Sequence, residues 1–158
     1  QLMQHYDFDM TVQVDWAGEE PGDRAGIAMM GYVYRYLALE KGGEGLKVTL
    51  YQGETHEFPK GSECDERVWE TPEESVAVPG GKVYLQMQVR SDFSGAHPEA
   101  RVRFAYSLDG KAYEPVGDWW TAVCGGWVSA RPGIFAANFD GRVSPGYADF
   151  KNCVITEV

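Results

Sequence analysis

Lys82-Val-Tyr-Leu-Gln-Met-Gln-Val-Arg90 decides the fold, because apolar and polar side chains alternate along it without a break. Successive side chains of a β-strand point to opposite faces, so this pattern is typical of a strand with one face on a core and the other in water. The side chains expected in the core are Val83, Leu85, Met87 and Val89. Those expected to point outward are Tyr84, Gln86, Gln88 and Arg90.

A second alternating stretch, Ala100–Leu108, runs directly into Asp109-Gly110. Glycine adopts positive φ without strain, so this pair predicts a hairpin turn at the end of the strand. The side chains expected to be buried are Val102, Phe104, Tyr106 and Leu108. The side chains expected to be exposed are Arg101, Arg103, Ala105 and Ser107.

Further strands are expected on both sides of this pair, separated by segments rich in glycine and proline. They are Phe8–Trp16, Tyr32–Leu39, Leu46–Gln52, Ser75–Val78, Tyr113–Val116, Trp127–Ser129, Gly133–Ala137 and Tyr147–Glu157. Roughly ten short strands without a helix predict an all-β fold, a two-sheet antiparallel β-sandwich of the jelly-roll kind. We expect a single domain over residues 1–158, with Phe135 and Phe150 also in its core. Residues 53–74, acidic and interrupted by Pro59 and Pro72, are expected to form a long loop or an irregular hairpin.

Composition excludes two classes of partner. The formal net charge is −10, whereas a nucleic-acid partner requires concentrated Lys and Arg. A membrane is excluded because no apolar run approaches the roughly 20 residues that span a bilayer. The start of the chain, Gln1-Leu-Met-Gln-His5, also lacks the charged-then-apolar pattern of a secretion signal.

Three widely spaced cysteines, Cys64, Cys124 and Cys153, show no metal-site pattern and cannot all pair internally, so they leave the redox compartment open.

Catalytic carboxylates are the next feature to look for, because a pair of acids can act as general acid and general base. Glu63-Cys64-Asp65-Glu66-Arg67 places its first two acids at the spacing of a Glu-x-Asp-x-Glu strand. Arg67 occupies the position of the third acid, and the segment lies in a charged loop without apolar alternation. We therefore expect no catalytic residue in this chain.

Metal ligands are equally scattered. His5, His56 and His97 are isolated, whereas a metal site needs several convergent ligands. A structural calcium ion held by oxygen ligands is a further alternative, and the candidate acids for it are Asp7, Asp9 and Asp149.

Several blocks of the sequence resemble, in their order and spacing, the β-sandwich that follows the catalytic propeller in family 43 glycoside hydrolases, the β-xylosidases and α-arabinofuranosidases. The blocks are Ala25-Gly-Ile-Ala28, Tyr34-Arg-Tyr-Leu37, Arg103-Phe-Ala-Tyr-Ser-Leu-Asp-Gly110, Trp127 with Ala130-Arg-Pro-Gly-Ile-Phe135, and Gly146-Tyr-Ala-Asp-Phe150. The resemblance implies a concanavalin A-like sandwich that serves as a sugar-binding or scaffolding domain, with a catalytic propeller in cis. It also implies an extracellular or periplasmic location, or an intracellular one if the enzyme cleaves oligosaccharides.

A sugar site requires flat aromatic rings and planar polar groups on one surface. If the Tyr32–Leu39 strand shares a sheet with the two strands analysed first, the outward residues form one groove for a xylan-type polysaccharide. Its residues are Tyr34, Tyr36, Gln88, Arg90, Arg103 and Trp120. Two alternatives remain open: the aromatic surface packs on a propeller without binding sugar, or the chain is a free-standing glucanase of the same fold.

Overall fold

The computed structural model describes residues 7–54, 69–95, 99–123 and 130–158. Within these ranges the chain forms ten β-strands and no helix. The strands are β1 (Phe8–Ala17), β2 (Asp23–Met30), β3 (Val33–Gly42), β4 (Gly45–Glu54), β5 (Trp69–Ala77), β6 (Lys82–Asp92), β7 (Glu99–Ser107), β8 (Glu114–Thr121), β9 (Arg131–Asn138) and β10 (Tyr147–Glu157). No helix that could cross a bilayer is found in the described part of the chain.

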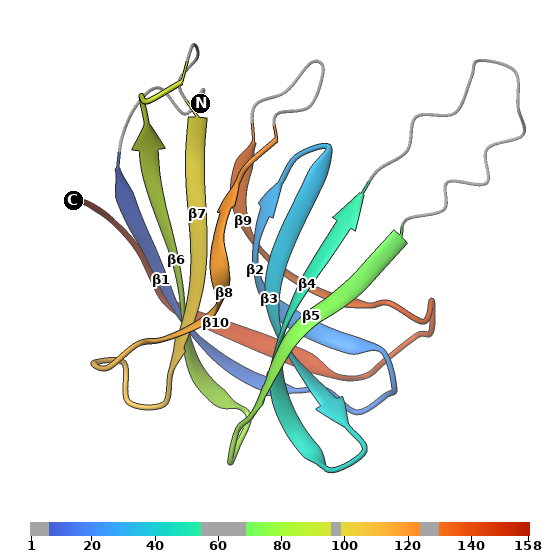
Figure 1. Cartoon of the computed structure of the whole chain (residues 1–158). Coiled ribbons are helices and arrows are strands. Elements are labelled where there is room, and N and C mark those ends of the chain that lie inside the picture. Colours follow the sequence, from blue (N-terminus) through green and yellow to red (C-terminus); the bar gives the residue numbers. More distant parts are fainter. Residues whose placement is uncertain (1–6, 55–68, 96–98, 124–129) are drawn as a thin grey trace, which may run out of the picture.

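The strands form two five-stranded antiparallel sheets that pack face to face (Figure 1). The first sheet has the order β10-β1-β6-β7-β8, and the second has the order β5-β4-β3-β2-β9. The chain crosses between the sheets after β1, β5, β8 and β9, so neighbouring strands come from distant parts of the sequence. The predicted all-β, two-sheet sandwich is confirmed.

The space between the sheets is filled by inward side chains from both of them. Val83, Leu85 and Met87 on β6 are fully buried, and Val89 is nearly so, which confirms the predicted register. Phe104 on β7 packs in the same core. Each fully buried side chain of this size contributes about 1.5–3 kcal/mol to folding, so the alternating strands supply most of the driving force.

β2 is the strand that alternation does not predict, because both of its faces are covered. Ala25, Ile27 and Met29 face the core, and Ala28 is buried in a second cluster on the outer face. Strands covered on both sides lose the alternating pattern.

β5 begins inside the stretch predicted as a loop or irregular hairpin and contains Pro72. The loop alternative is wrong for residues 69–74, whereas the irregular hairpin agrees with the pairing of Gly53 with Glu70 and of Glu54 with Trp69. β5 lies at the edge of the second sheet, where a residue without an N–H group is tolerated. The pairing of β4 with β5 shifts by one residue at this point, so that Tyr51 lies opposite Pro72. Residues 55–68 lie outside the described ranges.

The end of β7 differs from the prediction at three positions. Ala105 and Ser107 are buried, whereas Leu108 is 51% exposed because the strand ends at Ser107. The Ser107 hydroxyl accepts a hydrogen bond from the Gly110 amide at 2.9 Å, which draws Ser107 into the predicted turn. Gly110 has φ 72°, as a hairpin glycine requires, so the turn is confirmed.

Phe135 and Phe150 were both expected in the core. Phe150 is partly buried against it, but Phe135 lies on the outer face of the second sheet. There it meets Tyr36 edge to face, with ring centroids 5.1 Å apart. Both residues lie on strands at a sheet edge, where alternation does not distinguish the core face from a second apolar cluster.

β10 is an edge strand that carries a bulge. Its pairing with β1 shifts between Thr11 and Gln13, so that two residues, Asn152 and Cys153, lie opposite the single residue Val12. Asn152 has φ 53°, a left-handed conformation that asparagine tolerates better than most residues.

Candidate functional site

The residues predicted to bind a sugar are divided between the two sheets. Tyr34 and Tyr36 lie on β3 in the second sheet, whereas Gln88, Arg90 and Arg103 lie on β6 and β7 in the first. The outer faces of two packed sheets point in opposite directions. The prediction that these residues line one groove is therefore wrong.

Tyr34 and Tyr36 also differ from the prediction in exposure, because only 7% and 2% of their surfaces reach solvent. The Tyr36 ring stacks between Tyr51 and Phe139, with centroid distances of 5.0 and 5.6 Å. Tyr34 lies flat over its cross-strand partner Gly53, where an added Cβ would come within 2.2 Å of the ring. These rings pack on the sheet and on one another, so they present no open face to a sugar.

A largely buried network of hydrogen bonds and ion pairs connects these tyrosines to charged side chains, and we call it the Arg24 cluster. Its members are Arg24, Tyr34, Tyr36, Glu40, Tyr51 and Glu70. The guanidinium lies over the rings of Tyr51 and Phe139, at 4.1 and 4.7 Å from their centroids. It donates to Glu40 at 3.0 Å, to Glu70 at 3.1 Å and to the Tyr36 hydroxyl at 2.7 Å.

The tyrosine hydroxyls complete this network. Tyr34 and Tyr36 donate to Glu70 at 3.0 and 2.8 Å, and Tyr51 donates to Glu40 at 2.8 Å. Burial raises the pKa of all three phenols above the ordinary value, and the neighbouring carboxylates raise it further. The phenols therefore remain neutral donors. The second carboxylate charge of the cluster is balanced by Lys47, whose ammonium group lies 3.1 Å from Glu40.

Glu40 bears on the glucanase alternative, because a glycosidase needs a carboxyl with a raised pKa as its general acid. Burial raises the pKa of Glu40, but hydrogen bonds from Thr49, Tyr51 and Lys47 and the charge of Arg24 outweigh it. The net result is a pKa below the usual value. Glu40 is therefore an ionised structural partner and is unsuited to the acid role.

Gln88, Arg90 and Arg103 do share one surface, the outer face of the first sheet. Arg103 donates twice to the Gln88 carbonyl oxygen, at 3.0 and 2.8 Å, and its guanidinium lies 4.8 Å from the Trp119 ring centroid. Arg90 forms an ion pair with Asp9 at 2.8 Å. The planar groups expected to meet a sugar are thus engaged with other side chains of the same surface.

Trp120 lies on the opposite side of β8 from Trp119. It is partly buried against the core, and Arg35 lies 5.4 Å from its ring centroid. Successive strand residues point to opposite faces, so only one of the two tryptophans can point outward, and it is Trp119. The placement of Trp120 in the predicted groove is wrong.

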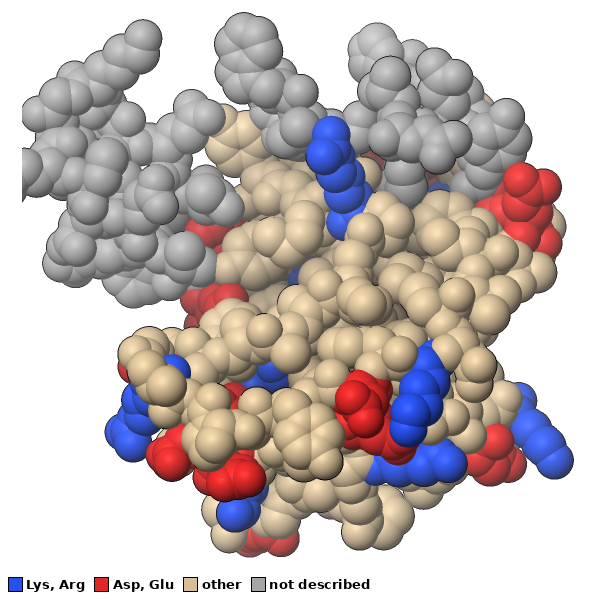
Figure 2. Space-filling model, turned by 180° about the vertical axis from the view of Figure 1, so that it is seen from behind, with Lys and Arg blue, Asp and Glu red and all other residues tan. Residues whose placement is uncertain are grey.

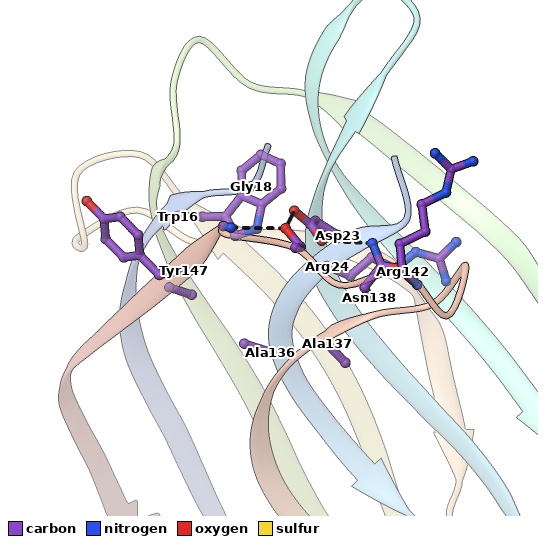
Figure 3. Close-up of a pocket in the computed structure, with 12 residues that line it drawn as sticks. Trp16, Gly18, Asp23, Arg24, Ala136, Ala137, Asn138, Arg142 and Tyr147 are labelled. Atoms are coloured by element: carbon purple, nitrogen blue, oxygen red, sulfur yellow. Dashed lines mark hydrogen bonds between the residues drawn. The ribbon is translucent and has the colours of Figure 1, made fainter. Parts of the chain in front are cut away.

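The structure instead places a pocket of about 280 Å³ at the side of the sandwich where β9 and β10 approach each other (Figure 3). The Trp16 side chain contributes to its wall, and Gly18 packs against that ring so closely that an added Cβ would come within 1.9 Å of it. Tyr147 and Arg142 lie on opposite sides of the pocket (Figure 3). Trp16, Tyr147 and Ala148 contribute apolar side chains to its lining.

Tyr147 is the aromatic residue that the prediction missed. It is 62% exposed and lies at the start of β10, opposite Ala17. The alternation of side chains could have identified it. Ala148 and Phe150 pack against the core, so Tyr147, on the other face of the same strand, must point outward. Arg142, also exposed, forms no side-chain hydrogen bond or ion pair with another described residue.

Asp23 fixes the polar end of the pocket. One carboxylate oxygen accepts from the amides of Glu19 and Glu20 and from the Ser144 hydroxyl, and the other accepts from the Asn138 amide at 2.9 Å. Burial raises the pKa of Asp23, but these four hydrogen bonds outweigh it and lower the pKa to about 2. The side chain thereby ties the β1–β2 loop to the segment that leads into β10.

Asp23→Ala is expected to lower the free energy of unfolding by about 2 kcal/mol near neutral pH, because four donors lose a charged acceptor. A depressed pKa stabilises the fold above the unfolded value of 3.8, and this contribution is lost as the pH falls toward about 2. The difference between wild type and variant should therefore narrow over that window in urea titrations at several pH values. A difference that stayed constant down to pH 2 would contradict the assignment. Asp118→Ala, at an exposed position on β8, is the control.

The acids proposed for calcium do not converge. Asp9 lies opposite Thr156 and Asp149 lies opposite Asp15, which are at different ends of β1. Asp7 accepts a hydrogen bond from the Ser91 amide. Within the described ranges, no group of three or more His, Cys, Asp or Glu residues is placed to hold a metal ion.

Several predictions fall outside the described residues. They concern the acids Glu63 and Asp65, the loop histidines His5, His56 and His97, the strand at 127–129 with Trp127, and Cys64 and Cys124. Cys153, on β10, is free and exposed.

The model of the β-xylosidase C-terminal concanavalin A-like domain family matches residues 1–155, nearly the whole chain. The chain belongs to this family. The resemblance inferred from the sequence blocks is thereby confirmed, and the sandwich is a GH43 C-terminal domain of the β-xylosidase type.

Solved structures agree with the fold of this GH43 C-terminal domain. An engineered GH43 glycoside hydrolase with endo-xylanase and exo-arabinofuranosidase activity is 17% identical with a TM-score of 0.71, and the match covers 100% of this chain and 30% of that one. A bifunctional GH43-CE protein from Bacteroides eggerthii is 21% identical with a TM-score of 0.68, covering 96% of this chain and 18% of that one. The xylan β-1,4-xylosidase from Bacillus halodurans C-125 is 15% identical with a TM-score of 0.64, covering 94% and 27%.

The domain thus spans less than a third of each of these structures. At such low identity, the likeness concerns the fold alone. A comparison with curated proteins gives no match.

Proposed function

We propose that this GH43 C-terminal domain is a non-catalytic accessory module that binds carbohydrate of the xylan type and accompanies a catalytic domain in the same polypeptide. The observation that carries the proposal is the exposed Tyr147 ring beside the 280 Å³ pocket. The membership of the family and the xylan-related activities of two similar structures support the choice of polysaccharide.

The chemistry of the pocket suits a neutral pyranose. An aromatic ring binds the apolar C–H face of a sugar, and the exposed face of Tyr147 is available for this contact. Arg142 supplies N–H donors for hydroxyl groups on the other side of the pocket. The space between Tyr147 and Arg142 is lined by the small residues Ala136 and Ala137, whose short side chains leave it open (Figure 3).

Tyr147→Ala is expected to weaken binding of xylo-oligosaccharides about fivefold, because one stacked ring contributes roughly 1 kcal/mol. The ring is mostly exposed, so the melting temperature should not change. Titration calorimetry with xylan, arabinan and glucan fragments measures the effect. Phe93→Ala is the matched control, since Phe93 is equally exposed but follows the opposite end of the first sheet. Equal affinity in both variants would exclude Tyr147 from the site, and the absence of heat with every fragment would exclude sugar binding.

A purely structural role, in which the sandwich packs on a catalytic propeller, is the second candidate. It is favoured by apolar side chains exposed along the neighbouring edges of the two sheets, Ile134 on β9 at 46% and Ile155 on β10 at 60%. In the view from behind, uncharged residues predominate across the middle of the molecule (Figure 2). Ile134→Lys would then destabilise the full-length enzyme and leave the isolated domain unaffected.

A further inference from the structure

A second hollow adjoins the pocket of Figure 3. Its volume is about 420 Å³, and it shares Trp16 and Tyr147 with the first pocket. Tyr147 therefore stands at the boundary between two concave regions. The remaining wall of the second hollow is polar, with Asp15, Lys82 and Asp149 among its residues.

The register of β1 and β10 explains this arrangement. Tyr147 lies opposite Ala17 and Asp149 lies opposite Asp15, so both side chains point to the outer side of the first sheet. Two residues along a strand correspond to about 7 Å, which sets Asp149 beyond the aromatic ring. A chain molecule that crosses Tyr147 from the first pocket would meet Asp149 next.

The charged side chains of the second hollow differ in how far they are already bound to other protein groups. Asp15 is engaged by Lys151 at 2.5 Å and by Gln13 at 3.2 Å. Asp149 and Lys82 are exposed, and no hydrogen bond or salt bridge joins either side chain to another described residue. The Lys82 ammonium group lies 6.0 Å from the Tyr84 ring centroid. A carboxylate accepts from hydroxyl groups and an ammonium group donates to them, so this pair suits an uncharged polyhydroxylated ligand.

We propose that the two hollows are adjoining subsites for one linear oligosaccharide, with Tyr147 between them, and that Asp149 and Lys82 bind the hydroxyl groups of the second sugar unit. This inference rests on the proposed sugar binding and specifies its ligand as an oligomer of at least two neutral pyranose units. A monosaccharide occupies the first subsite alone.

Titration of the domain with xylose, xylobiose and xylotriose tests the proposal. Affinity is expected to rise about tenfold from xylose to the longer ligands, because the second subsite adds about two hydrogen bonds. Asp149→Ala should reduce the affinity for xylotriose about fivefold and leave the affinity for xylose unchanged. Asp118→Ala, an exposed acid on the opposite edge of the first sheet, should change neither affinity.

The outcomes separate this inference from the proposed function. Equal affinity for all three ligands, with binding lost in Tyr147→Ala, would overturn the second subsite and leave sugar binding intact. Equal loss for xylose and xylotriose in Asp149→Ala would also overturn it. Absence of binding by every ligand would overturn both.

Discussion

Replacing Arg24 with Met should lower the free energy of unfolding by about 3 kcal/mol, although methionine keeps an unbranched apolar side chain at this position. The guanidinium binds Glu40, Glu70 and the Tyr36 hydroxyl, and it packs between the rings of Tyr51 and Phe139. Without it, two largely buried carboxylates lose their common cation. Urea denaturation followed by circular dichroism measures the loss.

A control and a second substitution distinguish this account from a simple loss of packing. Arg101→Met removes an exposed arginine near Trp119 and should cost about 0.5 kcal/mol or less. In the Arg24→Met background, Glu70→Gln should recover part of the stability, because Glu70 pairs with Arg24, whereas Glu40 keeps Lys47 as a second cation. Strictly additive losses in the double variant would contradict the buried charge network.

Tyr36→Ala should cost about 3 kcal/mol, whereas Tyr36→Phe should cost only about 1 kcal/mol. The alanine variant leaves a cavity between Tyr51 and Phe139, while phenylalanine keeps the ring and loses only the hydroxyl contacts with Arg24 and Glu70. The same denaturation experiment compares both variants. Tyr147→Ala is the reference for an exposed tyrosine, and a similarly small effect in Tyr36→Ala would mean that the Tyr36 ring does not hold the outer face together.

The core of the sandwich could be predicted from the sequence because alternation reports burial directly. On β6 the inward residues Val83, Leu85 and Met87 are all fully buried. On β3 the same alternation correctly separates Leu37 from Tyr36, but both residues are buried. Alternation assigns a residue to a face, and it does not reveal that a second cluster covers that face.

The candidate site could not be predicted in the same way, because it depends on which strands share a sheet. The tyrosines of β3 and the polar residues of β6 are both outward, yet the chain crosses between the sheets after β5. The residues of each strand do not indicate which of the two sheets that strand joins. The pairing of Tyr34 with Gly53 lets the ring lie over the glycine, and this contact too depends on strand pairing.

The bulge at Asn152 has a consequence for how these molecules behave in crowded solution. An exposed edge strand is a template on which a second chain can add its own strand, which is a common start of aggregation. The two residues at 152 and 153 interrupt the regular spacing of the backbone groups on β10, and Lys151 places a charge beside them. This edge can therefore remain exposed beside other protein surfaces without recruiting a neighbouring strand.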